Sequence, residues 1–371
     1  GDALVTGVSS GSSDADAVSI DAGGHVLAGT ANGRTDISAM AAGAGVKIVA
    51  ELGVGDETQA DDRYADGPGD APGSANAIAG TANPLRIRTG RLDLAATAGD
   101  LDIEALSSVD AATLTADTGN IEVLADGNFG MDSASALYGA LSITSSGSLR
   151  LDRAISGGTQ SFLAHGNVVF TNLTTTGLPA DPGDVDITAE TGAISGGDIH
   201  ASGSIRLDGN GITFGTIEAG LDSLLTSTGD IVGHAQIAGN TVNDIAGSTG
   251  APGSIRIDII RGKTLIFDAT GDLTLPDLEV ASDLVLRAGT LNVHVTQVPS
   301  GPDPLHLTLT GGRGTIGTLA NVTVDSLAGL TIDQLRFIDA NIGTTAQHVS
   351  VLSAYVPGSL WLTTPLQTLH F

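Results

Sequence analysis

A six-residue stretch recurs along this chain and constrains its fold more than any other feature. Each copy is a glycine followed by alternating polar and apolar residues, a pattern typical of a β-strand with one buried face. The glycine allows a tight corner that a side chain would obstruct. The clearest copies are residues 147–152, 203–208 and 253–258, and looser copies begin at Gly99, Gly119, Gly183 and Gly271.

The spacing of the copies indicates that the strands belong to a solenoid. Gly99, Gly119 and Gly139 follow one another at equal intervals, and the same interval separates Gly183 from Gly203. A fixed period of this size marks repeats that cannot bury their own apolar face and must stack on their neighbours. Each repeat has room for two or three short strands and shows almost no helix-length periodicity. We therefore predict an all-β parallel β-helix with coils of about 20 residues.

Side chains that face inward on successive strands are expected to form the apolar columns that hold the fold together. Neighbouring strands lie about 4.8 Å apart, and each buried side chain contributes about 1.5–3 kcal/mol. Aromatic residues make up 3% of the chain, so Leu, Ile, Val and Ala must build this core. Charge pairs on the outward face contribute at most about 1 kcal/mol each. The residues expected to face inward include Leu101, Ile103, Ile121, Val123, Val185, Ile205 and Leu207.

Composition divides the chain into three parts. Residues 1–54 are small and acidic with strand-like pieces, and they form either the first coils or a separate cap. Residues 55–84 are rich in glycine, proline and carboxylates, which indicates a long loop. Residues 85–371 carry the repeat, and its persistence up to an abrupt end leads us to expect a segment of a longer fibre. Shorter loops are expected at 178–182, 247–252 and 299–304.

The charge balance argues against two classes of partner. The chain has 42 acidic and 15 basic residues and a formal net charge of -27. Like charge repels nucleic acid and anionic membrane surfaces, so neither is an expected partner. No apolar run is long enough to cross a bilayer, so we expect no membrane insertion. The chain contains no cysteine, which excludes disulfides and thiolate metal sites.

The acidic loop is a candidate site for a divalent cation. Its carboxylates are interrupted by Gly67, Pro68 and Gly69, which allow sharp turns. Calcium accepts six to eight oxygen ligands in loose geometry, so a flexible carboxylate-rich loop can close around it. The alternative is a solvated loop whose charges repel one another. The candidate calcium ligands are Asp56, Glu57, Asp61, Asp62, Asp66 and Asp70.

No catalytic constellation stands out, and we expect no enzymatic activity. The eight histidines are scattered singly, and no serine lies in a Gly-x-Ser-x-Gly motif on a strand-to-helix turn. An alternative remains, because parallel β-helices also serve as polysaccharide hydrolases and lyases, which need converging carboxylates. The candidate pairs are Asp61 with Asp62, Asp100 with Asp102, and Asp184 with Asp186. One tryptophan, three tyrosines and two lysines leave little from which to build a sugar-binding cleft.

In its period, turn glycines, missing cysteine, scarce lysine and acidic small-residue composition, the stretch 85–371 resembles the filamentous haemagglutinin-type exoproteins and adhesins of Gram-negative bacteria. The resemblance implies a right-handed parallel β-helix fibre that is secreted or displayed at the cell surface through an outer-membrane secretion partner. Asn83-Pro84-Leu85 matches only part of the Asn-Pro-x-Gly-type turn of the family's secretion domain. The family's roles are adhesion, biofilm-matrix formation and contact-dependent competition. We expect a stiff spacer that engages a cell-surface glycan, a protein receptor or a matrix polysaccharide.

Overall fold

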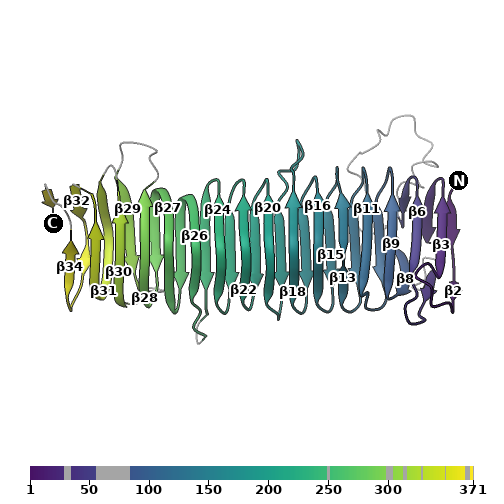
Figure 1. Cartoon of the computed structure of the whole chain (residues 1–371), viewed down its shortest axis with the longest axis horizontal. Helices are drawn as coiled ribbons and strands as arrows, with labels where there is room; N and C mark the ends of the chain where they lie inside the picture. The colour runs from purple at the N-terminus through teal and green to yellow at the C-terminus, as the bar shows by residue number, and fades with distance from the viewer. Residues whose placement is uncertain are drawn as a thin grey trace, which may run out of the picture. The chain divides into compact units, whose positions relative to one another are not determined.

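The computed structural model describes residues 1–28, 35–55, 84–248, 251–297, 304–311, 316–326, 329–346, 348–363 and 368–370. Over these residues the chain forms strands and no helix, and the strands pair in parallel as turns of a β-solenoid (Figure 1). About 16 turns follow one another at a spacing near 20 residues. This confirms the predicted all-β parallel solenoid. The chain divides into two compact units, Gly1–Asp186 and Ile187–Phe371, called unit 1 and unit 2 below.

Unit 1 runs to the start of β19 (Val185–Ala189), within which the division between the units falls. Its other strands are β1 (Ala3–Val5), β2 (Val8–Ser10), β3 (Val18–Ala22), β4 (His25–Ala28), β5 (Ile37–Ala39), β6 (Val46–Ala50), β7 (Gly53–Val54), β8 (Leu85–Thr89), β9 (Arg91–Ala96), β10 (Leu101–Ala105), β11 (Ala111–Ala116), β12 (Ile121–Ala125), β13 (Phe129–Met131), β14 (Ser133–Ala136), β15 (Leu141–Ser145), β16 (Leu149–Ser156), β17 (Gln160–Ala164) and β18 (Val168–Thr175).

Unit 2 contains longer strands, several of which pair with two or more strands of a neighbouring coil. They are β20 (Ile194–Ala201), β21 (Ile205–Gly209), β22 (Ile212–Ala219), β23 (Ser223–Ser227), β24 (Ile231–Ala238), β25 (Thr241–Ala246), β26 (Ile255–Ala269), β27 (Asp272–Arg287), β28 (Thr290–Gln297), β29 (Leu305–Thr310), β30 (Gly317–Asp325), β31 (Leu330–Thr344), β32 (His348–Val351), β33 (Ala354–Tyr355), β34 (Leu360–Thr363) and β35 (Thr368–His370).

Successive coils of unit 1 stack in register at the sequence period. Leu101 of β10 pairs with Ile121 of β12, and Ile121 pairs with Leu141 of β15, so each pairing advances the chain by one period. All three side chains are fully buried. The outward neighbours Asp102 and Glu122 lie directly above one another, as the period predicts. The seven residues expected to face inward are all buried, which confirms the predicted apolar columns.

Coil length varies in unit 2 without loss of the stack. Ile231 of β24 pairs with Ile255 of β26, so this coil is longer than the regular coils of unit 1. The additional residues form an excursion that is closed by an antiparallel bridge between Ser248 and Ala251. Beyond the excursion the inward alternation resumes, with Ile255 and Ile257 both buried. Loops therefore leave the coil at a corner, where added length does not disturb the packed strands.

The described residues of the segment 1–54 pair with the solenoid rather than forming a separate cap. Ile20 of β3 pairs with Ile48 of β6, and Ile48 pairs with Leu94 of β9. Three coils of unit 1 are thus in register although Ile48 and Leu94 lie more than two periods apart in the sequence. The segment 56–83, which holds most of the predicted acidic loop, lies between these two strands and outside the described residues.

The glycine that opens each repeat is required by close approach of the backbone. A Cβ added at Gly119 would lie 2.2 Å from the carbonyl oxygen of Gly99, and one added at Gly139 would lie 2.1 Å from that of Gly119. None of these three glycines has a positive φ. The sequence predicted the glycine corner correctly, and at these three corners the cause is the short distance to the coil below rather than a left-handed backbone. Gly183, which opens another copy of the repeat, does adopt a positive φ of 75°.

The residue after this glycine connects its coil to the next. Oδ1 of Asp100 accepts a hydrogen bond from the backbone N–H of Asn120 at 2.6 Å, and Oδ1 of Asn120 accepts one from Ala140 at 2.8 Å. Short side chains with an acceptor oxygen suit this position because they reach a neighbouring backbone N–H. The same ladder in unit 2 joins Asp230, Ser254 and Asp272.

The inward and outward assignments can be tested with two adjacent residues of β21. Ile205 is 1% exposed, whereas the side chain of Arg206 faces solvent. We expect Ile205→Asp to lower the free energy of unfolding by several kcal/mol, because it buries an unpaired charge. Arg206→Ser should cost less than about 1 kcal/mol. Equal shifts of the two variants in urea denaturation would contradict the assignment.

The corner glycines offer a second matched pair. Gly119→Ala places a methyl group against the Gly99 carbonyl and should lower the free energy of unfolding by about 2 kcal/mol or more, because backbone must move. At Gly211 the nearest atom to an added Cβ lies 3.9 Å away. Gly211→Ala should therefore be neutral, or stabilising by about 0.4–1 kcal/mol through the unfolded chain. If urea denaturation shows that both variants lower the free energy of unfolding by similar amounts, the glycine corners are not determined by the close approach of neighbouring backbones.

Candidate functional site

The predicted calcium ligands Asp56, Glu57, Asp61, Asp62, Asp66 and Asp70 all lie outside the described residues. Calcium binding by this loop therefore stays a prediction. Among the residues that the structure describes, no group of three or more His, Asp or Glu side chains is placed to hold a metal ion.

Four histidines of unit 2 each have a ring nitrogen close to the oxygen of one carboxylate. The pairs are His200 with Glu218 at 2.9 Å, His234 with Asp258 at 3.3 Å, His294 with Asp325 at 3.0 Å and His306 with Asp333 at 3.2 Å.

The carboxylate pairs considered for polysaccharide cleavage have different surroundings. Asp61 and Asp62 lie in the undescribed segment. Asp100 belongs to the corner ladder, where its Oδ1 accepts a backbone hydrogen bond, and Asp102 stacks on Glu122 of the next coil. Asp184, just before β19, and Asp186, within β19, are partly buried. The structure thus uses Asp100 to join coils.

Arg150 joins three successive coils of unit 1. Its Nη2 donates to Oδ1 of Asp132 and to the carbonyl oxygen of Asp110, each at 2.9 Å, and its Nη1 pairs with Asp152. The guanidinium passes over Gly130, where an added Cβ would lie 3.2 Å from Nη2. The hydrogen bonds to Asp132 and then to Asp152 raise the pKa of Arg150. The cluster contains both acidic and basic groups, as a catalytic site does. Its carboxylates, however, are paired with the Arg150 guanidinium and hold it in place.

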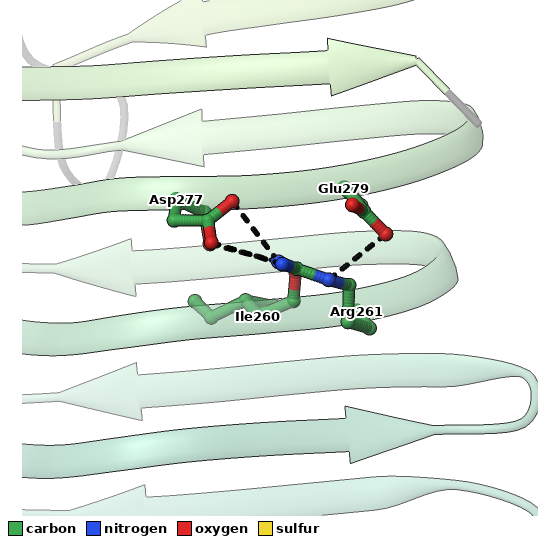
Figure 2. A network of polar contacts seen from close by, with 4 residues as sticks. All are labelled: Ile260, Arg261, Asp277 and Glu279. Atoms are coloured by element: carbon green, nitrogen blue, oxygen red, sulfur yellow. Dashed lines mark hydrogen bonds and ion pairs between the residues drawn. The ribbon is translucent and has the colours of Figure 1, made fainter.

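A second arginine cluster lies on β26 and β27 of unit 2 (Figure 2). Nε of Arg261 pairs with Oε2 of Glu279 at 2.8 Å, while Nη2 donates to Oδ2 of Asp277 at 2.9 Å. Nη1 donates to the Ile260 carbonyl oxygen at 2.9 Å. Both carboxylates face one guanidinium, whereas a glycosidase pair must face the substrate from two sides. The arrangement clamps adjacent coils.

One predicted loop of unit 1 is described, and a carboxylate holds it in place. Asp181 accepts hydrogen bonds from the N–H of Thr159 at 2.8 Å, the hydroxyl of Thr159 at 2.9 Å and the N–H of Gly183 at 2.9 Å. Burial raises the pKa of Asp181, but these hydrogen bonds outweigh it and bring the pKa below its ordinary value. The loop at 178–182 therefore has an ordered anchor at neutral pH.

The outward face of unit 2 carries a row of amides that ends in the only tryptophan of the chain, here called the amide row. Its members are Asn292, Asn321, Asn341 and Trp361. Nδ2 of Asn321 donates to Oδ1 of Asn292, and Nδ2 of Asn341 donates to Oδ1 of Asn321, both at 3.5 Å. A side-chain amide has two donors and two acceptor sites, so each keeps capacity for a ligand.

Trp361 belongs to the surface by register. It pairs with the exposed Asn341, whereas its neighbours Leu360 and Leu362 pair with the buried Ala340 and Ile342. Because neighbouring residues of a strand face opposite sides, the indole points outward, and it is 67% exposed. An exposed aromatic ring beside amides that keep further donors and acceptors is suited to stacking and hydrogen bonding with a ligand.

Sequence reasoning missed the amide row for an identifiable reason. The step from Asn292 to Asn321 is longer than the step from Asn321 to Asn341, so a fixed period does not align the three residues. The alternation of apolar residues around each asparagine was visible, and it does predict that all three point outward. The sequence does not show that this longer stretch forms a single coil, which is what brings the first two asparagines together.

The described residues contain no helix long and apolar enough to cross a membrane. No family model matches the chain, and neither a curated protein nor a solved structure resembles it at a significant level.

Proposed function

We propose that this chain is part of a secreted or cell-surface fibre, a stiff β-helical scaffold that binds glycan in adhesion or in a biofilm matrix. The amide row supports this proposal most directly, because it combines amide groups that keep further hydrogen-bonding capacity with an exposed indole on one face. Pyranose rings present hydroxyls to amides and an apolar C–H face to an aromatic ring. The rungs repeat at about 4.8 Å, so several can contact one extended chain of sugars.

The charged side chains support a scaffold in a different way. Arg150 and Arg261 hold carboxylates from neighbouring coils, and the corner ladder bonds one coil to the next. These contacts add to the backbone ladders between the coils and resist shear, which nondirectional apolar packing alone does not. A formal charge of -27 also disfavours acidic polysaccharides, so the expected ligand is a neutral glycan. Export through an outer-membrane partner and calcium binding at the acidic loop remain parts of this proposal.

Glycan binding can be measured by the fluorescence of the single tryptophan. Titration with neutral β-linked glucan and chitin oligosaccharides should change the emission of Trp361 with saturation, because the ring stacks on the ligand. Asn321→Ala should weaken binding about 5–10-fold, the loss of roughly 1 kcal/mol of hydrogen bonding. The control is Thr213→Ala, an exposed position in the same outward register, four coils from Asn292 at the near end of the row.

If Asn321→Ala and Thr213→Ala show the same emission change and the same affinity, the amide row is not the binding site. If no oligosaccharide changes the emission, but the chain still adheres to glycan-coated surfaces, recognition lies elsewhere on the fibre. Failure to adhere to any glycan or protein-coated surface would contradict the adhesive function itself.

The alternative function is polysaccharide cleavage through surface carboxylates. The Arg150 and Arg261 clusters are the observations that favour it, since each places a basic group beside two carboxylates. We expect incubation with acidic and neutral polysaccharides to release no reducing ends and no unsaturated products, because these carboxylates are paired with arginine. Product formation that disappears in Asp277→Asn, or in Asp132→Asn, would establish the enzyme and overturn this expectation.

A further inference from the structure

A carboxylate occupies one of the inward columns of unit 2. Asp244 of β25 pairs with Leu225 of β23 on one side and with Phe267 of β26 on the other, and all three are fully buried. Its neighbours Val242 and Ala246 on the same strand face also point inward. Ionised carboxylates rarely occupy such positions, because desolvation of an unpaired charge is costly.

The carboxyl group is part of a small buried polar cluster. Nε2 of Gln236 donates to Oδ1 of Asp244 and to Oγ of Ser223, each at 2.9 Å. Gln236 and Asp244 are both 0% exposed. Both N–H bonds of the amide are thus used, while Oε1 of Gln236 and Oδ2 of Asp244 have no hydrogen-bond donor. Two buried acceptors without a donor indicate a missing proton.

No cation near the cluster can balance a negative charge. The strands packed against β25 are β23, β24 and β26, and their inward side chains are uncharged throughout the described residues. The nearest charged side chain in the register, Asp268 of β26, pairs with Ile245 and is itself acidic. A proton on Asp244 removes the charge and supplies the donor that the cluster lacks.

We propose that Asp244 makes the stability of unit 2 depend on pH. The folded coil binds one proton at this carboxyl group, and loss of that proton in alkaline solution weakens the stacking of the coils. Burial raises the pKa of Asp244 to about 8, against the opposing effect of the hydrogen bonds from Gln236 and from the Leu225 backbone. The unfolded chain releases this proton near the ordinary pKa of 3.8. Between these two values the folded unit holds one proton more, so its stability falls as pH rises. Above about 8 both states are ionised and this contribution is constant.

The test is urea unfolding of the full chain between pH 5 and about 9, followed by Trp361 emission, which reports on unit 2. One bound proton changes the unfolding equilibrium constant about tenfold per pH unit. Asp244→Asn should reduce the pH dependence of the unfolding equilibrium, called the slope here, by the equivalent of about one proton. The variant should also stabilise unit 2 at pH 8, because the asparagine amide supplies the missing donor without a charge. Asp208→Asn, which replaces an exposed carboxyl on β21 by the same amide, is the control and should keep the wild-type slope.

Equal slopes for the wild type and Asp244→Asn would overturn the proposal. The other buried carboxyl with a raised pKa, Asp36, lies in unit 1 and does not affect the comparison. If Asp244→Asn does not fold, infrared difference spectra of the wild type between pH 6 and about 9 decide the matter. A buried protonated carboxyl band at pH 6 that disappears at alkaline pH supports the proposal, and its absence at pH 6 contradicts it.

Discussion

Each coil of this solenoid has apolar side chains that it cannot cover by itself, and only a coil above and a coil below can remove them from water. Leu101, Ile121 and Leu141 are fully buried because they stack in one column at the coil spacing. Everything else follows from this constraint. The corner glycines have no side chain because the backbones approach closely there, and most charged residues face outward because the narrow interior is filled with aliphatic groups.

The same constraint decides what the sequence could predict. Two periodicities, the alternation along a strand and the repeat of the coil, are visible in the sequence, and together they predict the strands, the coil length and the stack of Asp102 on Glu122. Contacts that depend on loop length or on a missing side chain were not predictable. Asn292 pairs with Asn321 although the stretch of chain between them is longer than the regular period, and Arg150 reaches Asp110 only across Gly130.

The buried Asp244 is a different case. Its sequence context, with Val242 and Ala246 on either side, predicts an inward position from alternation alone. A search for chemistry among outward carboxylates passes over it, because functional acids are usually sought where solvent and substrate can reach them. In a solenoid the position with the strongest electrostatic consequence is inside the coil, where a charge has neither water nor a counter-ion.

The central claim is that successive coils are interchangeable layers in strict register. Deletion of residues 121–140 removes one complete coil and brings Leu141 into the place of Ile121, above Leu101. We predict that this variant keeps the β-sheet circular dichroism per residue of the parent and unfolds cooperatively in urea. Deletion of residues 121–130 removes half a coil and should abolish cooperative unfolding of unit 1, because the strands that follow no longer lie over their columns. If the two deletions impair cooperative unfolding to the same extent, the stacked register is contradicted.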